Sequence, residues 1–130
     1  MNQAEIVNSL HDAQIRGILL TAKNSANLLV ELTDHTRRSI SFNDVKRLRV
    51  ENFREGNTIL EFSVTRGEDI DPADVAYAYD LDMVVDKFLG AELNRLRQGD
   101  WLVIKIEPSF GCFAICICKS WNVNVDFRFE

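Results

Sequence analysis

The chain has 130 residues, of which 46% are hydrophobic and 27% charged, and its formal net charge is −5. This length suits a single domain over residues 1–130, and the composition is that of a globular protein. No apolar run approaches the roughly 20 residues of a membrane-spanning helix, and no signal peptide is visible. The negative charge disfavours nucleic-acid binding, which depends on clustered cations. We therefore expect a cytoplasmic protein that binds neither membranes nor nucleic acid.

The first half of the chain predicts a short helix followed by strands. Asn2 and Glu5 form a variant of the capping box, and Ile6 and Leu10 share one helical face. After a turn, apolar and polar residues alternate in several segments, which is typical of half-buried strands. The predicted strands are 15–22, 28–32, 39–42 and 45–50, with the second and third forming a hairpin.

The next segments are a strand, an ambiguous stretch and a clear helix. In the strand 59–65, alternation places Leu60 on the same side as Phe62 and Val64, and Ile59 on the opposite side. The dipeptide Asp71-Pro72 could cap a helix, but apolar residues then recur at every second position, which favours a strand at 75–81. An apolar stripe at 3.6-residue spacing predicts an amphipathic helix over 83–97.

Three closing strands are predicted at 101–107, 112–119 and 121–129. Their short connections indicate an antiparallel meander, because parallel pairing needs a long crossover. About eight strands with one substantial helix and one short N-terminal helix define a mainly β, α+β fold. Two arrangements would bury these strands: an antiparallel β-sandwich, or one strongly curved sheet wrapped on the helix.

Three cysteines, Cys112, Cys116 and Cys118, lie at even positions of one predicted strand. They would therefore project from one face. A structural zinc site needs four ligands, and both histidines lie far away in the sequence. We interpret the cysteines as small buried residues beneath the helix in a reducing compartment, and we expect no metal and no cofactor.

A histidine next to an aspartate, His11-Asp12, is the strongest catalytic candidate. Such a pair could form a general base, with Ser9, Ser109 or a cysteine as the nucleophile. No sequence context of a known nucleophile surrounds it. The alternative is that Asp12 binds backbone amides in a turn while His11 packs at the helix end.

Charged residues form two further groups. Asp69, Asp71 and Asp74 lie in an acidic stretch that lacks the EF-hand pattern, so we expect a solvated face able to attract a basic partner. Arg47 and Arg49 share one side of a predicted strand. They could grip carboxylates or phosphates, or keep an outer sheet face soluble. The candidate binding surface comprises His11, Asp12, Asp69, Asp71, Asp74, Arg47 and Arg49.

Part of the chain resembles a group of known proteins. The resemblance rests on three segments: Leu10-His11-Asp12-Ala13, Ser41-Phe42-Asn43-Asp44-Val45 with Leu48-Arg49, and Asn52-Phe53-Arg54-Glu55-Gly56-Asn57 with Ile59. In this order they resemble small bacterial β-sandwich proteins of uncharacterised families and of the toxin-immunity type. The resemblance covers residues 10–65 and implies a bacterial, cytoplasmic setting, but its motifs contain no catalytic residues.

These observations predict a small protein that acts by binding another protein and is not an enzyme. Neutralisation of a toxin, as by an immunity protein, is one concrete form of this function. The alternatives are a small hydrolase or isomerase that uses His11 with a carboxylate, and a structural or oligomeric β-sandwich module. Because Trp101, Val103 and Ile59 lie opposite the core-facing residues of their strands, we also expect a homodimer that buries this surplus.

Overall fold

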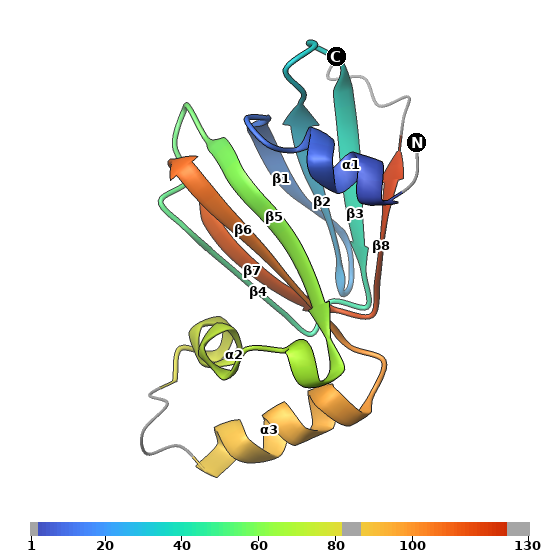
Figure 1. Cartoon of the computed structure of the whole chain (residues 1–130), viewed down its shortest axis with the longest axis vertical. Coiled ribbons are helices and arrows are strands. Elements are labelled where there is room, and N and C mark those ends of the chain that lie inside the picture. Colours follow the sequence, from blue (N-terminus) through green and yellow to red (C-terminus); the bar gives the residue numbers. More distant parts are fainter. Residues whose placement is uncertain (1–2, 82–86, 125–130) are drawn as a thin grey trace.

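The computed structural model describes residues 3–81 and 87–124 (Figure 1). Its helices are α1 (Gln3–Ser9), η1 (Gly67–Asp69), α2 (Pro72–Tyr79) and α3 (Lys87–Gln98). Its strands are β1 (Gln14–Ala22), β2 (Ser25–Glu31), β3 (Arg37–Asn43), β4 (Arg47–Glu51), β5 (Thr58–Arg66), β6 (Leu102–Phe110), β7 (Phe113–Cys118) and β8 (Ser120–Asn124). Within the described residues, every helix is too short or too polar to cross a membrane.

The strands form one antiparallel sheet in the order β4-β7-β6-β5-β1-β2-β3-β8. The predicted mainly β, α+β class is confirmed, and so is the predicted hairpin, which pairs β2 with β3. The sheet is not closed into a barrel, and a two-sheet sandwich is not confirmed. Its two halves meet between β1 and β5, where the described pairing is that of Gln14 with Thr58.

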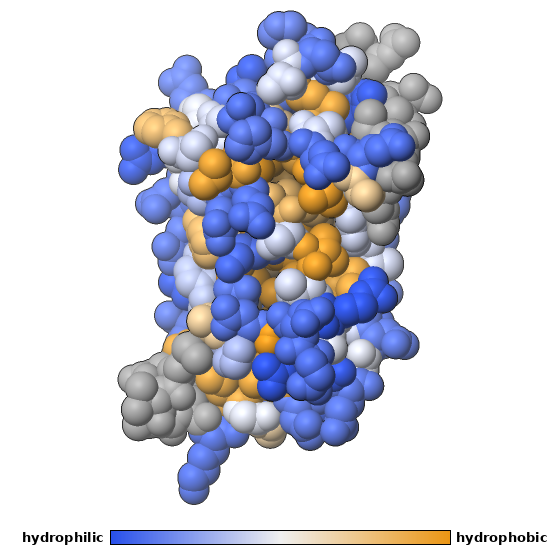
Figure 2. All heavy atoms as spheres, viewed as in Figure 1, coloured by the Kyte–Doolittle hydropathy of each residue, from blue (hydrophilic) through white to orange (hydrophobic). Residues whose placement is uncertain are grey.

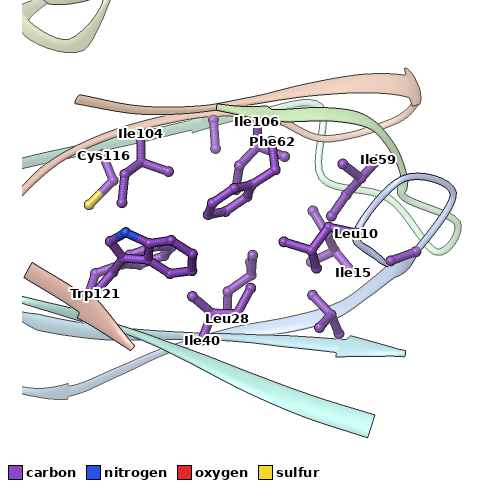
Figure 3. Packing of buried hydrophobic residues seen from close by; sticks show 14 of the residues in the cluster. Leu10, Ile15, Leu28, Ile40, Ile59, Phe62, Ile104, Ile106, Cys116 and Trp121 are labelled. Atoms are coloured by element: carbon purple, nitrogen blue, oxygen red, sulfur yellow. The ribbon is translucent and has the colours of Figure 1, made fainter. Parts of the chain in front are cut away.

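One core lies between the two halves of the sheet. Figure 3 shows side chains from both halves pointing toward one another, with Leu28 and Ile40 on one side and Phe62 and Ile104 on the other. The ring of Trp121, on β8, lies 5.3 Å from that of Phe62, on β5. Apolar packing therefore holds together two halves that share little backbone hydrogen bonding.

The segment predicted as a strand at 75–81 is the helix α2, so that prediction was wrong. Asp71 caps the helix by accepting a hydrogen bond from the backbone N–H of Ala73 at 2.9 Å, and Pro72 occupies the first helical position. The helix ends at Asp80, whose φ is +57°. The alternating apolar residues are compatible with a helix here because Val75 is buried beneath it while the tyrosines pack at its borders.

Helices α2 and α3 cover the other face of β6 and β7. A second apolar cluster joins Val75 and Leu96 of the helices to Val103, Ile115 and Ile117 of the strands. The predicted helix over 83–97 is confirmed from Lys87, and residues 83–86 lie outside the described residues. Because β7 is covered on both faces, it is apolar at nearly every position.

The predicted C-terminal meander is only partly correct. Strands β6 and β7 form an antiparallel pair, but β8 pairs with β3 in the other half of the sheet. The second edge of β7 is already occupied by β4, through pairs such as Leu48 with Cys116. After Cys118 the chain therefore crosses to the opposite half, where Trp121 pairs with Phe42. Residues 125–129 of the predicted last strand lie outside the described residues.

An irregularity at the start of β5 reverses the predicted orientation of two side chains. The register with β6 shifts between Ile59 and Glu61. This bulge lets both Ile59 and Phe62 enter the core, while Leu60 is exposed. The prediction that Leu60 shares a face with Phe62 was therefore wrong, since strict alternation does not hold across a bulge.

Candidate functional site

Arg47 and Arg49 fasten helix α2 to strand β4. The guanidinium of Arg47 donates to the carbonyl of Ala78 at 3.2 Å, and that of Arg49 donates to the carbonyl of Tyr77 at 2.8 Å. Each guanidinium also lies over a tyrosine ring, at 4.9 Å for Arg47 and 4.2 Å for Arg49. The two guanidinium groups thus bind carbonyls of the last turn of α2, where the carbonyl of Tyr77 also accepts from the backbone N–H of Asp80 at 3.1 Å. The predicted pair is thus present, but it serves packing within the chain.

The predicted acidic residues have separate surroundings. Asp71 caps α2, and Asp69 is exposed at the end of η1. The carboxylate of Asp74 is mostly buried and lies 3.4 Å from the ammonium of Lys105. In the described part of the chain, the structure brings together no group of three His, Cys, Asp or Glu side chains that could hold a metal ion.

His11 and Asp12 form the turn between α1 and β1. Nδ1 of His11 donates to the carbonyl of Leu60 at 2.7 Å, while Nε2 lies 3.6 Å from the Asp12 carboxylate. Both side chains are about 60% exposed. The candidate nucleophiles Ser9 and Ser109 each donate to a backbone carbonyl. His11 therefore connects the turn to the bulge in β5.

The three cysteines are buried, as predicted, but they do not lie beneath the helices. They belong to the core between the halves of the sheet, whereas the alternate residues Ile115 and Ile117 face α2 and α3. Burial raises the pKa of Cys112. A hydrogen bond to Cys118, together with burial, raises the pKa of Cys116. The same hydrogen bond lowers the pKa of Cys118. All three thiols are buried in the core, which limits their access to a substrate.

Three large apolar side chains are exposed where the β4–β5 loop meets the bulge of β5 and the end of β6. These are Phe53, Leu60 and Phe110, with 48%, 47% and 55% of their surface exposed. We call them the apolar patch. The segments that carry them adjoin, since Thr58 pairs with Phe110 and the Arg54 guanidinium lies 5.7 Å from the centroid of the Phe110 ring. Exposed apolar groups on adjoining segments are a feature of binding surfaces.

The side chain of the buried residue Asn57 connects the segments that carry the apolar patch. Oδ1 of Asn57 accepts hydrogen bonds from the backbone N–H groups of Arg54 at 2.8 Å and Cys112 at 3.1 Å. Gly111 approaches so closely that an added Cβ would lie 2.5 Å from this oxygen, and its φ is +86°. The β4–β5 loop, which carries Phe53, is therefore joined to the turn that follows Phe110 at the end of β6.

Three carboxylates border the apolar patch and the outer face of β5 and β6. Glu61 and Glu107 stand directly opposite each other on these neighbouring strands. The ammonium of Lys105 lies 3.2 Å from Glu107 and 3.4 Å from Asp74. We call Glu61, Asp74 and Glu107 the acidic face. Among the described residues, Lys105 is the one cation within 4 Å of the carboxylates of Asp74 and Glu107, and no cation lies within 4 Å of that of Glu61.

The pKa values of this cluster reflect its charge balance. Burial raises the pKa of Asp74, and the neighbouring carboxylates of Asp71 and Glu107 add to this, against the opposing effect of Lys105. Burial alone would lower the pKa of Lys105, but hydrogen bonding to Glu107 and the charge of Asp74 raise it overall. A cluster with more anions than cations favours additional positive charge.

Sequence reasoning found Asp74 but missed Glu61, Glu107 and the apolar patch. Glu61 and Glu107 are far apart in the sequence, and their pairing depends on the register that the bulge sets. The available signal was weaker: Glu61 lies on the polar side of an alternating strand, where exposed carboxylates are common.

A different apolar opening lies below α1, where β5 and β8 separate. It has a volume of about 400 Å³ and is lined by Ala4, Val7, Asn8, Val64, Arg66 and Trp121. Figure 2 shows apolar side chains along the middle of this side of the molecule. Its lining has few polar groups that would orient a ligand, so the opening exposes a border of the core.

In comparisons with protein-family models, curated proteins and solved structures, the chain matched none. Its function is therefore inferred from the side chains and their surroundings.

Proposed function

We propose that this chain is a cytoplasmic protein-binding module whose partner presents a basic surface. The opposition of Glu61 and Glu107 beside exposed apolar side chains is the observation that carries this proposal. The apolar patch supplies anchors, and the acidic face supplies the charge that selects the partner. Neutralisation of a basic bacterial toxin is one concrete form of this function.

Like charges at opposed positions of adjacent strands destabilise a sheet. A cation of a partner placed between Glu61 and Glu107 would remove that repulsion. Burial of Leu60 and Phe110 would at the same time withdraw apolar surface from water, which is the main driving force of association. Both terms favour the complex over the free protein.

The alternative of a hydrolase or isomerase gives His11 a catalytic role. Its Nδ1 is held by the carbonyl of Leu60, and the predicted hydroxyl nucleophiles are bonded to other carbonyls. These contacts favour a structural role for His11. The alternative of an oligomeric module is tested by measuring the oligomeric state in a sedimentation experiment.

The homodimer stays a prediction, although the side chains that suggested it have other surroundings. Val103 packs against the helices, and Ile59 enters the core through the bulge. Sedimentation at micromolar concentration distinguishes a dimer from a species of 14.9 kDa.

The test of partner binding uses the purified chain as bait in a lysate of the source cells. We expect a basic protein to be retained at low salt and released as ionic strength rises. The variants Glu107→Gln and Leu60→Ser/Phe110→Ser should each weaken its retention. Leu20→Ser is the matched control, because Leu20 is 76% exposed and lies outside the apolar patch.

The captured protein is then purified and titrated against the same variants by calorimetry. The double variant should bind at least about tenfold more weakly, as for the loss of central apolar anchors. Equal affinity for the wild-type chain, both surface variants and Leu20→Ser would contradict the proposal. Co-expression with the captured protein tests the toxin form, since a growth defect should be relieved by the wild-type chain and less by the double variant.

A further inference from the structure

A groove surrounds Trp101, which lies in the chain between the end of α3 and the start of β6. It consists of two cavities of about 540 Å³ and 320 Å³ that share Trp101 and Lys119 in their walls. The larger cavity is also lined by Asn24, Asp44, Val45 and Lys46, and the smaller by Arg66, Gly67, Gly99, Asp100 and Leu102. The larger cavity falls within the size range of small-molecule sites. We call both cavities together the Trp101 groove.

Three cations line the Trp101 groove. The ammonium groups of Lys46 and Lys119 lie 5.1 Å and 5.0 Å from the centroid of the Trp101 ring, and Arg66 lines the smaller cavity. Across residues 3–81 and 87–124, neither Lys119 nor Arg66 has a carboxylate within 4 Å. Two ammonium groups thus gather at one aromatic ring in a chain that is acidic as a whole.

A buried carboxylate holds Lys46 in place. Glu92 is 2% exposed, and its Oε1 accepts hydrogen bonds from Lys46 at 3.0 Å and from Arg95 at 3.1 Å. The hydroxyl of Tyr79 donates to the other carboxylate oxygen. Because these contacts fix the position of the Lys46 ammonium, little conformational entropy is lost when a ligand binds it.

The groove also contains two carboxylates, so it is not uniformly basic. Asp44 and Asp100 line its walls and are exposed. Because Glu92 already pairs with Lys46, the groove has two cations without a carboxylate within 4 Å among the described residues, Lys119 and Arg66, against these two exposed carboxylates. These carboxylates repel an anionic ligand. Removing one of them should therefore strengthen the binding of such a ligand, whereas removing a cation should weaken it.

We propose that the Trp101 groove binds a small phosphorylated molecule. Lys119 and Lys46 would hold its phosphate, and Arg66 would contact the part of the ligand that occupies the smaller cavity. A phosphate carries more negative charge than a carboxylate and has three acceptor oxygens, so it can accept hydrogen bonds from more than one cation at once. Lysine binds phosphate as a point charge, and arginine adds a planar pair of donors. This site is separate from the apolar patch and does not depend on the proposed partner.

The experiment titrates the full-length chain with inorganic pyrophosphate at constant ionic strength, with sodium chloride as the reference salt. Fluorescence is recorded in a Trp121→Phe background, so that the signal comes from Trp101. ³¹P line broadening of pyrophosphate, measured with the unmodified chain, gives a second readout that does not require this background to fold. We expect a saturable change in both.

The variants Lys119→Gln and Arg66→Gln should each weaken pyrophosphate binding by about tenfold, the effect of losing one charge-assisted contact. Asp100→Asn should strengthen binding, because it removes a repelling charge. Lys87→Gln is the matched control, since Lys87 is an exposed lysine on α3 that lies outside the groove. A response that does not saturate, or that Lys87→Gln changes as much as Lys119→Gln does, would overturn the proposal.

Discussion

Two charged clusters on the side of the sheet that the helices cover have opposite charge balances. At Glu92, one buried carboxylate receives hydrogen bonds from Lys46, Arg95 and Tyr79. At Lys105, one ammonium pairs with Asp74 and Glu107, and the third carboxylate of the acidic face, Glu61, stands opposite Glu107. The first cluster satisfies its charge within the chain, whereas the second leaves negative charge unsatisfied.

The pKa values of the two central carboxyls move in opposite directions. Burial raises the pKa of Glu92, but hydrogen bonds from Tyr79, Lys46 and Arg95 outweigh burial and bring it below its ordinary value. Burial raises the pKa of Asp74, and Lys105 does not compensate. A buried carboxylate therefore stabilises a fold only when its donors outweigh its loss of hydration. The unbalanced negative charge of the acidic face instead lowers the stability of the fold. In the proposed complex, a basic partner would offset this loss.

The largest expected effect is that of Glu92→Gln, which removes the charge that Lys46 and Arg95 share. We expect the free energy of unfolding at pH 7 to fall by about 2–3 kcal/mol, as for breaking a buried ion pair. Because the pKa of Glu92 is lowered, this stabilisation is complete above the ordinary glutamate pKa of 4.5 and is lost as the pH falls through the lower pKa of the folded state.

Urea unfolding at several pH values measures this effect. Glu68→Gln is the control, because Glu68 is exposed, and it should change the free energy of unfolding by less than about 0.5 kcal/mol. Similar values for the two variants would mean that the Glu92 cluster adds no stability.

Next in size is Lys105→Met, which leaves the acidic face without its described cation. We expect a loss of about 1–2 kcal/mol at pH 7, because a partly buried Asp74 then lacks a charged partner. The loss should shrink near pH 3, because the raised pKa of Asp74 favours its protonated form there. Urea unfolding with Lys87→Met as the control measures it, and an equal loss at both pH values would exclude an electrostatic origin.

A smaller effect of opposite sign is expected for Asp74→Asn. The raised pKa of Asp74 means that the folded state binds its proton more tightly than the unfolded state does. The ionised Asp74 therefore destabilises the wild-type fold fully at pH values above its pKa in the folded state. As the pH falls through that pKa, Asp74 becomes protonated and the wild-type stability increases. At pH 7 the variant should be more stable by about 0.5 kcal/mol, and the difference should vanish below the ordinary aspartate pKa of 3.8.

Thermal unfolding from pH 3 to pH 8 tests this sign. Lower stability of Asp74→Asn at pH 7 would show that the pair with Lys105 outweighs the burial of Asp74, and the two clusters would then be alike.

The smallest effect concerns Glu61→Thr, which removes the repulsion across β5 and β6. We expect stability to rise by about 0.2–0.5 kcal/mol, the usual size of a cross-strand pair. Glu55→Thr, in the exposed β4–β5 loop, is the control. Urea unfolding measures the change, and a loss of stability would mean that Glu107 does not repel Glu61.

Local sequence patterns determined most of the secondary structure. Alternation located seven of the eight strands correctly and the start of β8, and 3.6-residue spacing located α3. These patterns are informative because each depends on which residues must face an apolar neighbour. The turn residues between β2 and β3 gave their hairpin in the same way, since His35 adopts a φ of +69° in a short connection.

Tertiary structure decided the features that matter for binding. The apolar residues Val75, Tyr77 and Tyr79 are compatible with either a strand or a helix. The helix is stabilised by the cap at Asp71, by packing on β7 and by the arginines of β4. The partner of β8 depended on β4 having taken the free edge of β7. The pairing of Glu61 with Glu107 and the exposure of Leu60 followed from one bulge. A sequence pattern specifies which face of an element is apolar, but the neighbour across that face depends on contacts between residues far apart in the chain.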